Sequence, residues 1–175
     1  MNDMDSPLDD IFLKQVNENL GIAHKVCRLY FADAMDREDV LQEMMYQLYK
    51  SYRSFDGRSK FSTWMYRVCL NTALTSRRRY KYRKAESLEL EHHEIAEPAS
   101  DNPDEAAASL WDAIAILSPL NKAIILLYLE NLSYDEIANI TGLTKSNVSV
   151  RLVRIKKELE LELRKTIKSI EDVNP

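Results

Sequence analysis

The 175-residue chain is long enough for one ordinary domain or two small ones, and its 45% apolar and 30% charged content is that of a folded protein. No apolar run approaches the ~20 residues that a membrane-spanning helix needs, and the acidic N-terminus carries no secretion signal. We therefore expect a cytoplasmic protein without direct membrane insertion. Only three glycines and five prolines supply turns, which predicts an all-α fold.

Helical patterns fill the first half of the chain, where we predict three or four helices. Most apolar side chains of residues 8–33 recur at helical spacing. Asp36 is the predicted N-cap of a helix over 37–52. The stretch SFDG at 54–57 predicts a break with a turn glycine, and a further helix runs from Phe61 to about Arg83. The predicted inward side chains of the 37–52 helix are Val40, Leu41, Met44, Met45 and Leu48.

Charge divides the chain into two parts. Nine Lys/Arg and no Asp/Glu lie between Arg58 and Lys84, whereas eight acids and no Lys/Arg lie between Ala85 and Ser109. The acidic stretch carries two prolines and little large apolar content, which is typical of a flexible linker. We therefore predict two small helical domains, 1–84 and 106–175, joined by an acidic linker over 85–105.

Four helices are predicted in the second half. The first covers 106–117, and the second, over 119–131, opens on a Ser-Pro pair, since proline is tolerated in the first helical turn. The third covers 134–141 and begins with a capping-box pattern, a serine followed three residues later by a glutamate. The last begins at Thr144 or Ser146 and runs to about residue 168.

The last two of these helices have the pattern of a helix-turn-helix. Ala138 is small enough to let the two helices approach, and Gly142 accepts the positive φ that the turn favours. Val148, Leu152 and Ile155 give the second helix an apolar docking face. Its opposite face carries short polar donors that reach base edges and cations that hold phosphates. The alternative interpretation is a helical hairpin with a solvated basic face.

The segment FSTWMYRVCLNTALTSRRRYKYRK, residues 61–84, combines aromatic and basic residues without acids. Basic side chains alone bind any polyanion. Aromatic rings next to them favour unpaired bases, because a ring stacks on an exposed base or inserts between two bases. The alternative for Trp64 is a plain core position. The alternative interpretations of the basic run RRRYKYRK are a solvated helix end and a non-specific phosphate-binding segment.

Two motifs in this order resemble the extracytoplasmic-function group of bacterial RNA polymerase sigma factors, over nearly the whole chain. DREDVLQEMMYQLYKSYRSFDGRSKFSTWMYRVCLNTAL is similar to the family's second conserved region, and LSPLNKAIILLYLENLSYDEIANITGLTKSNVSVRLVRIKKEL to its fourth. The resemblance implies a sigma factor that binds core polymerase and opens promoter DNA. It also implies an anti-sigma partner in many members, no cofactor, and a monomer when free.

The resemblance implies three groups of site residues. The acidic helix of the second region binds the coiled coil of the largest polymerase subunit, and here it matches Asp36, Asp39, Gln42 and Glu43, with Met44 and Tyr46 nearby. The following loop captures a flipped base of the downstream promoter element, and here it matches Phe55, Asp56, Gly57, Arg58, Ser59 and Lys60. The next helix opens and reads that element, with positions matching Thr63, Trp64, Arg67, Asn71, Thr75, Arg77, Arg78 and Arg79.

The recognition helix of the fourth region reads the upstream element. The predicted DNA-binding residues are Lys145, Ser146, Asn147, Ser149, Val150, Arg151, Arg154, Lys156 and Lys157. Many members carry a basic base-reading residue where this chain has Ser149. The departure leaves the fold prediction intact and the promoter sequence open.

Two other classes of function compete with this interpretation. A stand-alone repressor or activator would also carry a helix-turn-helix, but would have no use for the aromatic and basic segment 61–84. A metal enzyme would use His92, His93 and Glu94, but adjacent histidines point to different faces of a helix and no other ligand cluster is visible. We therefore expect no enzymatic activity. Cys27 and Cys69 are expected to be buried free thiols.

Overall fold

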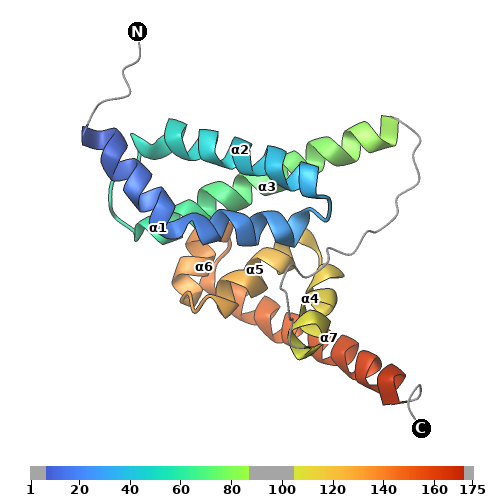
Figure 1. Cartoon of the computed structure of the whole chain (residues 1–175). Helices are drawn as coiled ribbons and strands as arrows, with labels where there is room; N and C mark the ends of the chain where they lie inside the picture. The colour runs from blue at the N-terminus through green and yellow to red at the C-terminus, as the bar shows by residue number, and fades with distance from the viewer. Residues whose placement is uncertain (1–6, 87–104, 172–175) are drawn as a thin grey trace. The chain divides into compact units, whose positions relative to one another are not determined.

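The computed structural model describes residues 7–86 and 105–171, and within these ranges every regular element is a helix (Figure 1). The chain divides into two compact units, Met1–His93 and Glu94–Pro175. The all-α, two-part fold class is therefore confirmed. Most of the predicted linker, residues 87–104, and with it His92, His93 and Glu94, lies outside the described residues.

Three helices form the first unit: α1 (Pro7–Tyr30), α2 (Ala34–Tyr52) and α3 (Phe61–Glu86). Each helix packs against the other two, and α3 is the longest of them (Figure 1). The buried apolar residues of each helix recur mostly at intervals of three or four, so the three apolar stripes close one core. Its fully buried side chains include Val26, Val40, Met44, Leu48 and Met65.

The predicted N-cap of α2 is wrong by three residues. Asp33, in extended conformation, is the N-cap, and its carboxylate accepts hydrogen bonds from the backbone N–H groups of Met35 (2.7 Å) and Asp36 (3.0 Å). Asp36 lies instead in the first turn of α2, where a negative charge is favoured by the helix dipole. Both aspartates fit the sequence rule for a cap, and only the backbone conformation selects one of them.

The loop between α2 and α3, residues 53–60, contains the predicted break. Gly57 has φ +71°, a conformation that side chains rarely adopt. The Asp56 carboxylate accepts a hydrogen bond from the backbone N–H of Arg58 (3.1 Å) and pairs with the Arg58 guanidinium (3.0 Å). The helix α3 begins at Phe61, as predicted, and it continues three residues beyond its predicted end at Arg83.

Four helices form the second unit: α4 (Glu105–Ala115), α5 (Pro119–Leu129), α6 (Tyr134–Thr141) and α7 (Lys145–Glu171) (Figure 1). Their predicted start signals are confirmed. Ser118 caps α5, whose first residue is Pro119. The Thr144 hydroxyl accepts a hydrogen bond from the backbone N–H of Asn147 at 3.2 Å, so Thr144, rather than Ser146, opens α7.

The turn between α6 and α7 has the predicted helix-turn-helix geometry. Gly142 ends α6 in the left-handed conformation, with φ +73°. Val148, Leu152 and Ile155 of α7 are buried, as predicted from their spacing. They pack in a core with apolar side chains of the other helices, which include Ile114, Ile124, Leu127 and Ile137. The opposite side of α7 therefore remains on the surface.

Replacement of Ser133 by alanine is expected to cost about 1 kcal/mol of folding free energy. Ser133 and Glu136 form the predicted capping box: the Ser133 hydroxyl accepts from the Glu136 backbone N–H, and the Glu136 carboxylate accepts from the Ser133 backbone N–H at 2.9 Å. Chemical denaturation of Ser133→Ala would measure the loss. Ser146→Ala, on the exposed first turn of α7, is the matched control, and an equal loss there would contradict the capping argument.

The two cysteines of the first unit are buried free thiols, as expected. The Cys27 Sγ atom of α1 lies 3.7 Å from the Met44 Sδ atom of α2. Burial raises the pKa of Cys27 from 9.0 to about 11, although the nearby Arg37 charge opposes the shift. Burial also raises the pKa of Cys69 to about 12, and repulsion from a Cys27 thiolate adds to that rise.

We expect both thiols to resist alkylation at pH 8 in the folded protein and to react at once in denaturant. The thiolate is the reactive species, and the folded protein disfavours it. The same pKa shifts predict how the free energy of unfolding depends on pH. Below pH 9 the two thiols are protonated in both the folded and the unfolded protein, so their contribution to stability is retained. As the pH rises from 9 toward 11 and 12, the free energy of unfolding falls. Mass spectrometry after iodoacetamide treatment checks the first result. Rapid labelling of folded protein would contradict it.

Candidate nucleic-acid interface

One side of α3 carries an exposed polar stripe. Its residues are spaced by three or four, so they lie along one face of the helix, and they are Arg67, Asn71, Thr75, Arg78 and Tyr82. The opposite side packs in the core through Met65, Cys69 and Leu70, among others. The structure thus places the predicted base-facing residues Asn71 and Thr75 on one exposed face. Tyr82, which is 75% exposed, was not among the predicted site residues.

The C-terminal half of α3 concentrates positive charge on this surface. Arg77, Arg78 and Arg79 are all exposed, and Lys81 follows them. Arg78 bonds through its Nε atom to the backbone carbonyl of Leu74 at 3.4 Å. Burial raises the pKa of Tyr30 in α1, and Arg77 lies close enough to oppose that rise. Consecutive arginines point in different directions around a helix, so they form a wide basic surface, which suits phosphates more than single bases.

Four aromatic rings meet where α2, the loop 53–60 and α3 join. The Trp64 ring lies 5.2 Å from the ring centres of both Phe55 and Phe61, and 6.2 Å from that of Tyr52. All four side chains are half-buried. Trp64 is therefore neither fully buried nor fully exposed: it packs against the other rings of the cluster, and part of it remains accessible. Its role in strand opening stays a prediction.

The exposed face of α7 has an apolar centre. Val150 and Val153 are 51% and 54% exposed, and they lie on the side opposite the buried Val148, Leu152 and Ile155. Exposed polar residues surround the two valines, and these are Ser146, Asn147, Arg154 and Lys157. Val153 was not among the predicted site residues. Its position three residues after Val150 was the signal that could have identified it.

Three of the predicted DNA-binding cations of α7 have partners inside the second unit. Lys145 pairs with Asp135 at 2.7 Å, and the Arg151 guanidinium donates to the Asn121 side-chain oxygen at 3.3 Å. The Lys156 ammonium donates to the Tyr128 hydroxyl at 2.8 Å and lies 4.0 Å from the centre of that ring. The bond to Tyr128 also raises the pKa of Lys156. These three cations therefore lie at the flanks of the helix.

The two units match two successive parts of one family. Residues 15–83 match the model of sigma-70 region 2, and residues 107–159 match that of sigma-70 region 4. The sigma-E factor of Haemophilus influenzae, described as an ECF RNA polymerase factor, is 32% identical over 142 residues, which cover 74% of this chain and 75% of the relative. The chain belongs to the extracytoplasmic-function group of the sigma-70 family. It is a sigma factor that directs promoter-specific transcription, as the resemblance implied.

Other comparisons agree with this assignment. The sigma-E factor of Escherichia coli K12 is 30% identical over 160 residues, which cover 83% of this chain and 84% of the relative. A co-crystal structure of the sigma factor RpoE with the anti-sigma factor NepR from Bartonella quintana has the same fold, with a TM-score of 0.77. At 19% identity it covers 87% of this chain and 96% of its own.

The predicted polymerase-binding surface of this sigma factor lies on α2. Asp39, Gln42 and Tyr46 are exposed at spacings of three and four, so they share one face. Asp36 and Glu43 are half-buried beside them, and Glu43 accepts a hydrogen bond from the Gln47 side chain at 2.8 Å. The face is acidic and carries a 57% exposed tyrosine.

Two predicted contact residues prove to be buried. Met44 is 0% exposed and contacts Cys27 inside the first unit, and Thr63 is 6% exposed on the inner side of α3. A side chain in the core cannot reach a partner or a DNA strand in this conformation. We therefore correct both assignments. Each of the two residues is next in sequence to a predicted site residue that is exposed or half-buried. Because neighbouring positions of a helix point about 100° apart, one of them can lie in the core while the other reaches the surface.

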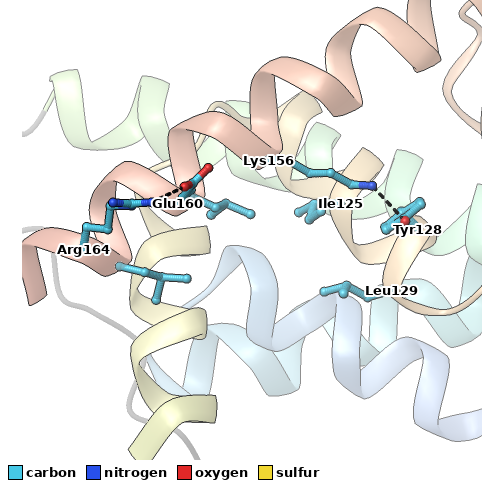
Figure 2. A pocket seen from close by; sticks show the side chains of 8 residues that line it. Ile125, Tyr128, Leu129, Lys156, Glu160 and Arg164 are labelled. Atoms are coloured by element: carbon cyan, nitrogen blue, oxygen red, sulfur yellow. Dashed lines mark hydrogen bonds and ion pairs between the residues drawn. The ribbon is translucent and has the colours of Figure 1, made fainter. Parts of the chain in front are cut away.

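The sequence analysis did not predict an apolar groove of about 470 Å³ between α5 and α7 (Figure 2). Its floor is formed by Ile125, Tyr128, Leu129, Leu159 and Leu163. Lys156 and a Glu160–Arg164 ion pair, 2.8 Å long, lie along α7 at its rim. Within residues 7–86 and 105–171, no helix is long and apolar enough to cross a membrane, and no group of side chains could hold a metal ion.

Proposed function

We propose that the sigma factor divides promoter recognition between its two units. Residues 1–84 bind core polymerase and open the downstream element, residues 106–175 read the upstream element, and residues 85–105 tether them. The observation that carries this proposal is a pair of exposed surfaces with the composition of DNA-binding surfaces, one on α3 and one on α7. Each carries exposed polar and basic residues, which on α7 surround two exposed valines, and each is anchored by an apolar face within its own unit.

The aromatic cluster and the α3 stripe act on the downstream element. Trp64 stacks on a base at the point where the strands separate, because a ring held in a cluster is already oriented for stacking. The loop residues Phe55 to Lys60 hold a flipped base. Asn71 and Thr75 face the bases of the opened strand, since a side-chain amide makes paired hydrogen bonds to a base. Arg67 and the arginines at 77–79 bind the phosphates.

The α7 surface acts on the upstream element. Arg154, Asn147 and Ser146 lie on the exposed face that a helix-turn-helix turns toward the major groove. Lys157 lies one turn further along and binds a phosphate. Arg151, Lys145 and Lys156 contribute charge from the flanks, where their intramolecular partners hold them. Ser149 is half-buried on one flank and reaches the backbone rather than a base.

Protein partners bind two other surfaces. The acidic face of α2, with Asp39, Gln42 and Tyr46, binds a basic coiled coil of core polymerase, because exposed carboxylates attract cations of a partner helix. The α5–α7 groove accepts the apolar face of a helix, and its charged rim sets the register (Figure 2). An anti-sigma factor is the proposed occupant of this groove, and the fold shared with a sigma factor in complex with such a protein supports it.

The free factor acts as a cytoplasmic monomer without enzymatic activity or a cofactor. Bacterial transcription takes place in the cytoplasm, and nucleotide chemistry belongs to the polymerase. A stand-alone repressor or activator remains the competing function. It would bind a palindromic duplex as a dimer and would not need polymerase to contact DNA.

A transcription assay separates the two functions. Purified factor and bacterial core polymerase are incubated with a library of genomic promoters, and the start sites are sequenced. Discrete new starts that share two spaced elements are expected only when both proteins are present. The control is core polymerase with a factor that carries Asp39→Arg and Gln42→Arg, which reverses the charge of the α2 face without touching either DNA surface. No new starts, together with tight binding of the factor alone to a palindrome, would establish the competing function.

A further inference from the structure

The centre of the exposed α7 face is apolar, and it lies outside the core of the described second unit. Val150 and Val153 are about half exposed, whereas the α7 residues that stabilise the core are Val148, Leu152, Ile155 and Leu159. Valine is a weaker helix former than alanine, so two exposed valines give a helix no local advantage. Their position on the recognition helix of a helix-turn-helix points to the major groove as their partner.

Three of the five cations around the two valines have partners inside the second unit. Lys145, Arg151 and Lys156 have partners in Asp135, Asn121 and Tyr128, respectively. Within the described second unit, no hydrogen bond or ion pair engages the side chains of Arg154 and Lys157. Arg154 follows Val150 by four residues and Val153 by one. Polar side chains thus surround the two valines, and the centre of the face is left to apolar contact.

Only one base presents an apolar group in the major groove, namely thymine through its 5-methyl group. Val150 and Val153 are separated by about 4.5 Å along the helix axis, which is close to the ~3.4 Å step between base pairs. Two branched side chains at this spacing match two neighbouring base pairs. We propose that Val150 and Val153 contact the methyl groups of thymines in the upstream element and thereby set its sequence preference.

This proposal rests on the proposed function, because it requires that α7 reads the upstream element. Deoxyuridine provides the test, since it pairs as thymine does and lacks only the methyl group. Each thymine of the upstream element of a promoter found in the transcription assay is replaced in turn. Holoenzyme affinity is then measured with the unchanged protein, so protein folding does not affect the result. At one or two neighbouring thymines we expect a loss of about fourfold each, the effect of exposing one buried methyl group.

Variants connect the methyl groups to the two side chains. Val150→Ala and Val153→Ala are expected to bind the thymine promoter about fourfold more weakly, with no further loss on the promoter that carries uracil at the matching position. Leu161→Ala removes an equally exposed apolar side chain further along α7 and is the matched control, with unchanged affinity on both promoters.

Three results would overturn the proposal. The first is an upstream element that contains no thymine. The second is unchanged holoenzyme affinity when uracil replaces thymine at any position. The third is that the affinity losses from uracil and from Val150→Ala or Val153→Ala simply add. Arg154→Ala distinguishes these results from a failure of the proposed function. If α7 reads the element by hydrogen bonds alone, Arg154→Ala weakens binding while uracil does not. If α7 does not read DNA, neither change has an effect.

Discussion

Trp64→Ala is expected to lower open-complex formation on a fully paired promoter by about five- to 150-fold. Stacking of one base on an aromatic side chain contributes about 1–3 kcal/mol, and that range corresponds to this factor. The Trp64 ring lies 5.2 Å from both Phe55 and Phe61, so its orientation is set before DNA arrives. Permanganate footprinting of unpaired thymines in the downstream element measures the opened fraction.

A promoter with a pre-opened bubble separates this role from a structural one. If Trp64 acts in strand separation, mismatched bases at the downstream element should restore most of the transcription that Trp64→Ala loses. If the substitution damages the first unit, the bubble should not help. Trp64→Phe keeps a ring in the cluster and is expected to retain more activity than the alanine variant. Full activity of Trp64→Ala on paired DNA would remove this residue from the mechanism.

The combined substitution of Arg77, Arg78 and Arg79 by glutamine is expected to weaken promoter binding by holoenzyme about a hundredfold at ~0.15 M salt. Each lost phosphate contact removes about 0.7–0.9 from the slope of log affinity against log salt concentration, so the slope should fall by about two to three. All three side chains are exposed, and glutamine has a helix propensity close to that of arginine. The fold of α3 should therefore persist.

Binding titrations at several salt concentrations would measure this slope. Arg28→Gln, an exposed position in the last turn of α1, is the single-charge control and should leave the slope unchanged. The loss should also be similar for promoters of different sequence, because phosphate contacts carry no direct sequence information. A loss confined to one promoter sequence would instead show that these arginines read bases.

Local signals explain why much of the fold could be predicted from the amino-acid sequence. The Ser133–Glu136 capping box and the turn at Gly142 each depend on residues within one or two helical turns. Helix-turn-helix packing was likewise predictable, since the spacing of Val148, Leu152 and Ile155 defines one face of a helix. Asp33 and Asp36 both met the local rule for the cap of α2, and nothing in the neighbouring residues distinguished them.

The sequence by itself therefore determined the helical segments, most of their capping signals, the helix-turn-helix and the family, because periodicity, capping and motif order are properties of neighbouring residues. Only the tertiary structure decided which site residues are available. It buries Thr63, and it engages Arg151 and Lys156 with Asn121 and Tyr128, which lie 30 and 28 positions away. Such contacts depend on how helices pack, and helix packing brings together residues that no local pattern connects.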